Sequence, residues 1–342
     1  MRHRDKKKVL SRLLLRLHLV VLIVLTISVP AAASADWSAI AEQKTSYTTD
    51  ALQFSSARRL RFTEDPSQPT GIPLGNPQDV IWEPSLEVMR SSSNNWGSNE
   101  LSVKAHGYIY TNNPIFNHGD YRIQDRQWLD QDTSILVRYR YVPNLFLGPN
   151  FERRTGTRSI QEERLTSHHW RAEVERRVNN DTTVTLVGRY GIRLYNDVFA
   201  ERDTNFYTVG PQLRRQLSSW LSVTLGYLYE RGLSDGRHDV QFNDDVSYFL
   251  HLISCGANLS LARNLTLELS YVHVRKTFTS NLVGDTHLDR MDQTHQGQVE
   301  LGYRFTSSWT GTLGFQRTQR SSTNVLRDFN DSIVSLGAEY RF

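Results

Sequence analysis

The sequence predicts an all-β protein, a transmembrane up-and-down antiparallel β-barrel of about 14 strands that follows a cleavable signal peptide. Three observations lead to this prediction. Segments of alternating apolar and polar residues fill the chain after residue 35. The connections between these segments are alternately short and long. The C-terminal segment 332–342 carries one unbroken apolar face and ends at Phe342.

The N-terminal 35 residues have the order of a secretory signal peptide. A basic region comes first, followed by a short apolar core at 19–29 and the small residues Ala33, Ser34 and Ala35. The basic residues are Arg2, Arg4, Lys6, Lys7, Lys8, Arg12 and Arg16. We therefore expect cleavage before Asp36, with a signal peptide at 1–35 and a barrel at 36–342. An uncleaved single-span anchor is the alternative interpretation.

Removal of the signal peptide changes the charge of the chain. The precursor has 40 Lys and Arg residues against 36 Asp and Glu, a net charge of +4. Because the signal peptide holds seven of the basic residues and one acid, the remainder carries 33 basic residues against 35 acidic ones. This balance argues against a nucleic-acid partner. Cys255 is the single cysteine, which excludes an intrachain disulfide framework, and we expect no cofactor.

Two kinds of connection separate the predicted strands. The short ones are 94–98, 130–132, 179–181, 218–219, 262–264 and 307–308, and the long ones are 63–79, 112–120, 148–163, 198–204, 234–245, 280–295 and 321–330. Outer-membrane barrels show this asymmetry between short periplasmic turns and long outer loops. The predicted strands are 41–58, 80–92, 99–111, 121–129, 134–147, 164–178, 183–197, 205–217, 221–233, 246–261, 265–279, 296–306, 310–320 and 332–342.

The predicted strands have the pattern of a lipid-facing sheet. After residue 35, no segment offers the roughly 18 apolar residues that a transmembrane helix needs, whereas a strand needs only every second one. Tryptophans flank the short turns at Trp96, Trp128, Trp220 and Trp309, and other aromatics lie toward the long loops at Tyr141, Tyr195, Tyr207, Tyr229 and Phe278. Two aromatic bands match the two membrane interfaces. The alternative is a soluble sandwich, in which the apolar face would pack on a second sheet.

The last strand carries a family resemblance. Val334, Leu336, Ala338, Tyr340 and Phe342 form its apolar face. A terminal strand of this kind resembles the closing strand of a bacterial outer-membrane β-barrel, and its final aromatics resemble the sorting signal that the outer-membrane assembly machinery recognises. The resemblance implies location in the cell outer membrane, contact with lipid and lipopolysaccharide, and porin-like passage of small polar or anionic solutes.

If the apolar residues face lipid, their neighbours face the lumen and form two charged walls. The basic wall would comprise Arg138, Arg140, Arg171, Arg189, Arg193 and Arg214 on four consecutive strands. The acidic wall would comprise Glu83, Glu87, Glu268, Glu300 and Glu339 on the opposite side of the ring. Guanidinium groups suit carboxylate, phosphate or sulfate, so the basic wall would bind and admit anions. The alternative is a network of internal ion pairs that fills the lumen.

Three other functions stay open on the sequence. The barrel could export a secreted acidic polysaccharide gripped by the arginine wall. It could be a closed structural or adhesive barrel that acts through its long loops. It could be an outer-membrane enzyme, although no motif places a nucleophile, and we predict neither catalysis nor a metal site.

Several polar groups of the long connections bear on these alternatives. The carboxylates and histidines in question are Asp235, His238, Asp239, Asp244, Asp245, Asp285, His287, Asp289, Asp292 and His295. We expect them to be solvated loop residues. The connection around Arg153, Arg154, Arg158 and Arg164 would be an exposed loop or would touch lipopolysaccharide phosphates.

Overall fold

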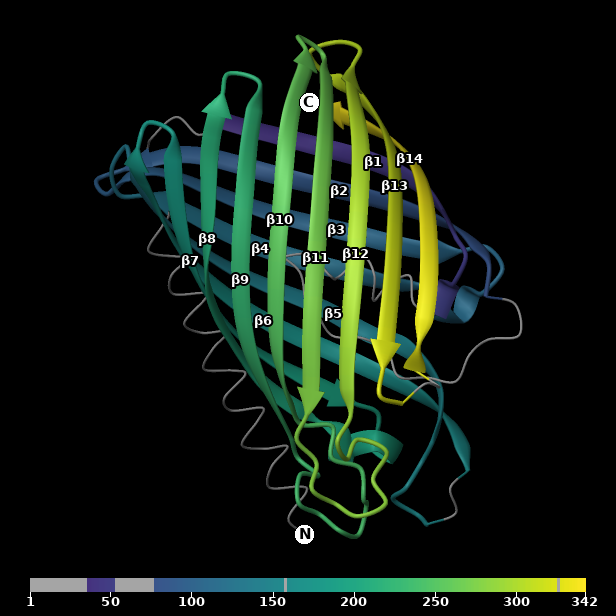
Figure 1. The fold of residues 1–342 in the computed structure, drawn as a ribbon. Helices are drawn as coiled ribbons and strands as arrows, with labels where there is room; N and C mark the ends of the chain where they lie inside the picture. Colours follow the sequence, from purple (N-terminus) through teal and green to yellow (C-terminus); the bar gives the residue numbers. More distant parts are fainter. Residues whose placement is uncertain (1–35, 53–76, 157–158, 325–326) are drawn as a thin grey trace.

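The computed structural model describes residues 36–52, 77–156, 159–324 and 327–342, and these form one closed barrel of 14 strands (Figure 1). Two short 3₁₀ helices, η1 (Pro114–Phe116) and η2 (Asp197–Arg202), lie in the connections. The strands are β1 (Asp36–Thr48), β2 (Asp79–Asn94), β3 (Gly97–Tyr110), β4 (His118–Trp128), β5 (Thr133–Phe151), β6 (Ile160–Asn179), β7 (Thr182–Tyr195), β8 (Thr204–Ser218), β9 (Leu221–Ser234), β10 (Tyr248–Ala262), β11 (Leu265–Phe278), β12 (Met291–Arg304), β13 (Trp309–Ser322) and β14 (Phe329–Arg341).

Each strand pairs in antiparallel fashion with its neighbours in sequence, and the first strand pairs with the last. Ile40 lies opposite Arg341 and Thr48 lies opposite Ile333, so the ring closes without an edge. Closure is required in hydrocarbon, which offers no partner to bare N–H and C=O groups. The predicted fold class and strand number are confirmed. The signal peptide predicted at 1–35, and most of the connection predicted at 63–79, lie outside the described residues.

Some strand limits differ from the prediction, mainly at the long-loop end. β1 spans Asp36–Thr48 instead of 41–58, β5 continues to Phe151, and β12 begins at Met291 instead of residue 296. The extra residues of β5 and β12 include polar groups such as Asn150 and Asp292, which composition assigned to loops. A strand that faces a polar lumen or rises above the membrane can carry such residues, so polarity alone does not mark its end.

The outer surface of the barrel exposes many apolar side chains, as the alternation predicts. Leu225 is 55% exposed, Leu336 is 67% exposed, and Val299 and Tyr303 of β12 are also exposed. A surface of this extent is stable in lipid and not in water. Within the described ranges, no helix is long and apolar enough to span a membrane.

The two aromatic bands are present, with a correction at the long-loop end. Trp96, Trp220 and Trp309 are exposed beside short turns, and Tyr207 and Tyr229 are exposed toward the opposite end. Tyr195 and Phe278, predicted in the same band, instead face the lumen. Tyr195 packs on the buried cluster of Val142, Leu145, Leu147 and Leu165, and Phe278 belongs to a buried cluster with Tyr248 and Leu250. Tyr195 and Phe278 are in phase with the inward residues of their strands. The prediction used only their location near the strand ends, and location near an end does not say which face a side chain occupies.

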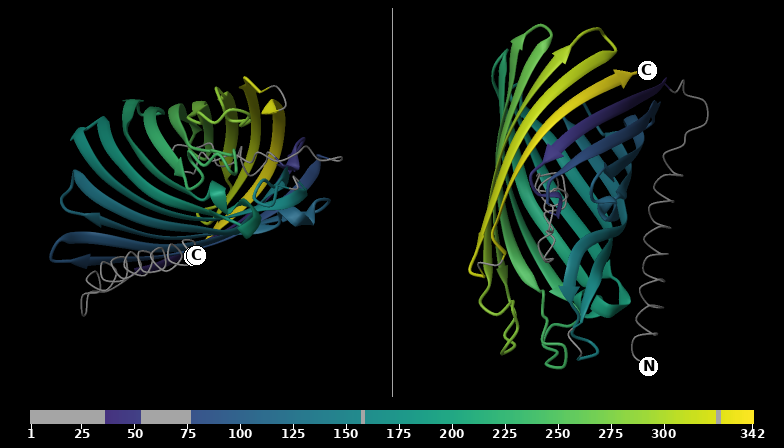
Figure 2. Two further views of the ribbon diagram at one scale, coloured as in Figure 1. Left: turned by 90° about the horizontal axis from the view of Figure 1, so that it is seen from below. Right: turned by 90° about the vertical axis from the view of Figure 1, so that its right-hand side faces the viewer.

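The barrel is not uniform along its axis. The right-hand view of Figure 2 shows walls that lie wide apart at the short-turn end and converge toward the long-loop end. The buried apolar clusters lie inside this converging half. The buried apolar side chains of the lumen therefore lie toward its long-loop end.

Candidate functional site

The lumen presents a row of arginines on β5, β6 and β7. Arg138 lies opposite Arg171, and Arg171 lies opposite Arg189, so three guanidinium side chains start from neighbouring positions on the inward face. Arg193 lies further toward the long loops, opposite Thr204 of β8. Like charges on adjacent strands repel one another and need nearby acceptors.

Internal acceptors engage most of the predicted basic wall. Arg140 donates to both carboxylate oxygens of Asp120 at 2.5 and 2.9 Å. Arg171 Nε donates to Glu173 at 2.5 Å. Arg138 donates to the side-chain oxygen of Gln124 at 2.5 and 2.8 Å.

Arg193 reaches further across the lumen than these three. It donates to the hydroxyl of Tyr248 at 2.6 Å and lies 3.4 Å from Glu230. Much of the basic wall therefore belongs to an internal ion-pair network.

The predicted acidic wall is also engaged, residue by residue. Glu300 of β12 forms an ion pair with Lys44 of β1 at 2.8 Å, a contact that spans two intervening strands. Glu83 accepts a hydrogen bond from Ser46, Glu87 lies 3.7 Å from Lys104, and Glu339 lies 2.8 Å from Arg341. Glu268 lines the cavity described next.

A polar cavity of about 640 Å³ occupies the short-turn half of the lumen. Inward residues of β8 to β12 line it, including Gln212, Arg214, Thr224, Glu268 and Gln298. Arg214 is exposed and faces this space, unlike the five arginines further along the wall. Of the two predicted walls, Arg214 and Glu268 are the members that the structure places in an open part of the lumen.

An apolar belt follows the cavity toward the long loops. Its members are Val187, Leu228, Tyr248, Leu250, Leu252, Val272, Val274 and Phe278, all on inward positions and at most 5% exposed. Beyond the belt, a small void of about 30 Å³ lies between Tyr195, Arg202 and Lys276. These side chains pack like a protein core on the lumen side of β7 and of β9 to β11.

Glycines on neighbouring strands let the lumen aromatics lie flat against the wall. A Cβ at Gly191 would come within 2.0 Å of the Phe206 ring, and one at Gly232 would come within 2.3 Å of Tyr248. The Arg193 guanidinium lies over the Phe206 ring at 4.1 Å. This close approach brings the cation–π contact and the apolar belt together at one level.

Three long connections meet at the long-loop side of the belt, namely η2, 235–247 and 279–290, and their buried charged residues are called the crown below. Arg202 of η2 donates to Asp244 and to Glu163, both at 2.7 Å. His287 lies 2.9 Å from Asp285 and 3.4 Å from Asp244. Because buried charges persist only when paired, these contacts hold the three connections together.

Burial shapes the protonation of the crown. Burial raises the pKa of Glu201 to about 7, and it lowers the pKa of His287 more than the nearby carboxylates raise it. Burial also disfavours ionised Asp285, but hydrogen bonds from His287 and Ser280 outweigh it and lower the pKa of that carboxyl to about 2. At neutral pH the crown thus contains an ionised Asp285 beside a neutral imidazole.

The expectation of solvated loops was wrong for part of this region. Asp244, Asp245, Asp285, His287 and Asp292 are buried, because the loops pack against one another instead of projecting into water. His238 and Asp235 remain exposed, as expected.

The arginine-rich connection was also misassigned as a freely exposed loop. Arg153 donates to the backbone oxygen of Asn243, and Arg154 lies 3.8 Å from Glu201, so both contact the crown. Arg164 retains an exposed pair with Glu162, and Arg158 lies outside the described residues.

Sequence reasoning missed the apolar belt, although the chain carries a signal for it. The run Tyr248–Phe249–Leu250–His251–Leu252–Ile253 does not alternate between polar and apolar residues. Such a run is typical of a strand that is apolar on both faces. Nothing local indicated the crown, since its members come from separate connections.

No family model and no curated protein matches the chain. Solved structures match it over nearly its whole length. The outer membrane channel DcaP of Acinetobacter baumannii has a TM-score of 0.51 and 10% identity, covering 92% of this chain and 99% of that one.

Two further structures have similar values. The anion-selective porin from Comamonas acidovorans has a TM-score of 0.47 and 7% identity, covering 90% and 99%. A bacterial polysaccharide outer membrane secretin has a TM-score of 0.49 and 10% identity, covering 88% and 98%. At these identities the similarity to DcaP shows the fold, which is that of an outer-membrane barrel.

Proposed function

We propose that the barrel is an outer-membrane channel for small polar or anionic solutes, held closed at its outer end by the apolar belt and the crown. The observation that carries the proposal is the polar cavity in the short-turn half of the lumen, which Arg214 and Glu268 line. Gln212 of the cavity lies opposite Thr185 of β7, and Arg189 is two inward positions further along the same strand. A polar solute that enters the cavity therefore approaches a basic wall.

Arginine in a confined lumen favours anions. A guanidinium fork matches carboxylate and phosphate oxygens, and lumen charges set the selectivity of wide barrels. Arg140, Arg171 and Arg193 already contact carboxylates, so an arriving anion would compete with internal partners there. Arg214, exposed in the cavity, is the first arginine that a solute from the short-turn side meets.

The crown supplies the means of closure. Its links are side-chain contacts between connections, whereas the barrel wall is joined by continuous strand pairing. The loops of a barrel can change their contacts while the hydrogen bonds between its strands stay intact. Channel opening would then require displacement of the crown and repacking of the belt.

Planar-bilayer recording tests the proposal. We expect low conductance from the unmodified barrel, higher conductance from Arg202→Gln, and anion preference in the open state. Neutral replacement of Arg138, Arg140 and Arg189 together should lower that preference, with Arg317→Gln on the lipid face of β13 as the matched control. A folded Arg202→Gln barrel without conductance would refute the channel, and unchanged selectivity in the triple variant would refute the anion pathway.

Export of an acidic polysaccharide is the second candidate. The difference between the two ends of the lumen favours this function. The cavity lies at the short-turn end and the packed belt lies toward the outer end, so a polymer would load from the periplasmic side. Acidic oligosaccharide added on that side should then block the open Arg202→Gln channel more strongly than a neutral one of equal length. Equal block by both would exclude recognition of an acidic polymer.

A further inference from the structure

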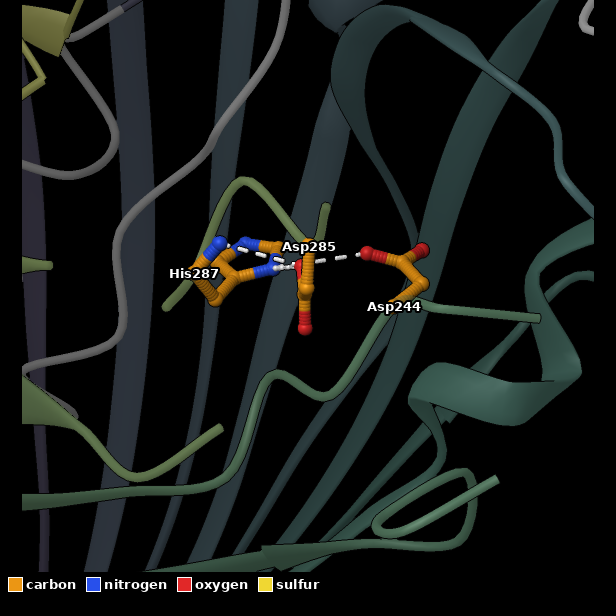
Figure 3. Close-up of side chains that lie close together, drawn as sticks. All are labelled: Asp244, Asp285 and His287. Atoms are coloured by element: carbon orange, nitrogen blue, oxygen red, sulfur yellow. Dashed lines mark hydrogen bonds and ion pairs between the residues drawn. The ribbon is translucent and has the colours of Figure 1, made fainter. Parts of the chain in front are cut away.

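We propose that the crown contains a binding site for a divalent transition-metal ion, formed by Asp244, Asp285 and His287 (Figure 3). Asp244 comes from the connection between β9 and β10, and the other two residues come from the connection between β11 and β12. All three side chains are buried, and one donor atom from each lies within 4.8 Å of the other two. The sequence predicted no metal site, because the third donor, Asp244, comes from a connection that lies about 40 residues away along the chain.

The donor atoms converge as ligands of a small cation do. His287 Nδ1 lies 2.9 Å from Asp285 Oδ1 and 3.4 Å from Asp244 Oδ1. Ligands bound at about 2.1 Å to a tetrahedral zinc ion lie roughly 3.4 Å apart, so the observed spacing is close to the one required. An ion bound by Nδ1 would replace its hydrogen bond to Asp285, with the imidazole hydrogen carried on Nε2.

Hydrogen bonding leaves one of these oxygens without a donor. His287 Nδ1 carries at most one hydrogen, and it can therefore donate to only one of the two carboxylates that face it. The contact with Asp285 is the hydrogen bond, whereas Asp244 Oδ1 is buried and has no hydrogen-bond donor among the described residues. A buried carboxylate oxygen in this state is costly, and a metal ion would satisfy it.

The remaining oxygens of both carboxylates are fixed from outside. Asp244 Oδ2 accepts from Arg202 Nε at 2.7 Å. Asp285 Oδ2 accepts from Ser280 Oγ at 2.6 Å and from the backbone N–H of Asp245 at 2.8 Å. These contacts orient both Oδ1 atoms toward His287, as outer-shell hydrogen bonds orient ligands in metal sites.

The ligand types indicate the class of ion. One imidazole nitrogen and two carboxylates suit Zn²⁺ or a neighbouring first-row metal, whereas Ca²⁺ and Mg²⁺ take oxygen ligands in larger number. Two carboxylates also bring two negative charges, and Arg202 divides its positive charge between Asp244 and Glu163. A divalent ion would balance the buried charge.

Metal binding would tie the two connections together and, through Arg202, join them to η2. The ion would therefore stabilise the closed outer end. This consequence for conduction rests on the proposed channel function, but the metal site itself does not.

Isothermal titration of the metal-stripped barrel in detergent with zinc chloride tests the site. We expect one Zn²⁺ per chain, with affinity lowered roughly tenfold or more by Asp244→Asn or His287→Gln, since even outer-shell changes reach that size. His238→Asn is the matched control, because His238 is an exposed histidine of the connection that carries Asp244. Heat-modifiable gel migration verifies that each variant keeps a folded barrel.

The outcomes separate the site from its effect. The site would be overturned if the folded wild-type barrel took up no zinc, or if Asp244→Asn and His287→Gln bound zinc as tightly as the wild type. In planar bilayers, zinc should reduce the residual conductance of the wild-type barrel and leave the conductance of Asp244→Asn unchanged. Zinc uptake that depends on Asp244 and His287 but leaves conductance unaltered would support the site and overturn its locking role.

Discussion

The short-turn half and the long-loop half of the barrel use the same strands in different ways. In the short-turn half, inward residues such as Gln212, Thr224 and Gln298 surround a polar cavity. Further along the same strands, inward residues such as Leu228 and Leu252 pack into a buried belt. Outward residues such as Leu225 and Leu336 are apolar and exposed, and polar residues such as Arg275 and Arg317 also face outward nearer the long loops.

This difference shows that the two faces of a barrel strand obey different constraints. The outer face meets hydrocarbon along the membrane and must be apolar there. The inner face meets water where the walls lie apart and other side chains where the walls converge. The packed half resembles a protein core, and substitutions there should have the costs of a core.

The largest expected effect comes from the crown. Arg202→Gln removes a buried cation that joins Asp244 and Glu163, and breaking a buried ion pair typically costs about 3–5 kcal/mol. Urea unfolding in detergent, followed by tryptophan fluorescence in EDTA, measures this loss. Arg164→Gln, which breaks a partly exposed pair with Glu162, should cost about 1 kcal/mol or less. Equal losses would show that the crown is not a buried network.

The apolar belt should give the next largest effect. Leu252→Ala removes a side chain that is 0% exposed, and such cavities cost about 2–5 kcal/mol. The matched change Thr224→Ala in the cavity should alter the free energy of unfolding by no more than about 0.5 kcal/mol. Similar losses at both positions would remove the distinction between a packed and an open half.

The outer face gives a third comparison, between neighbouring residues of β9. Leu225→Arg places a charge on the lipid side, at a cost of about 2–4 kcal/mol near the bilayer midplane. Thr224→Arg places the same charge in the polar cavity and should be far better tolerated. Folding titrations in lipid vesicles measure both, and the reverse order would contradict the assignment of the two faces.

The smallest effect on stability is expected at Arg214. Arg214→Gln should change the free energy of unfolding by about 0.5 kcal/mol or less, because this side chain is exposed in the cavity. It should nevertheless lower the anion preference of an open channel made with Arg202→Gln. Reversal-potential measurements in a salt gradient record this change, and an unaltered potential would show that Arg214 does not face the solute pathway.

Much of the fold followed from the sequence. The alternation of Leu221, Val223 and Leu225 with polar neighbours predicted the lipid face, and the regular exchange of short and long connections predicted the strand number. The inward placement of Arg138, Arg171 and Arg189 followed from the same period of two. The partners of Arg140 and Arg193 did not, because Asp120 and Glu230 are joined to these arginines only by the register between strands.

The sequence by itself determined which residues face lipid and that the sheet forms a ring, because hydrocarbon rejects polar side chains and bare backbone groups. Only the tertiary structure decided where the lumen is open and where it is packed. An inward leucine or aspartate is compatible with several environments, and the distance between opposite walls selects among them. Contact between two connections likewise brought Asp244, Asp285 and His287 into one buried cluster.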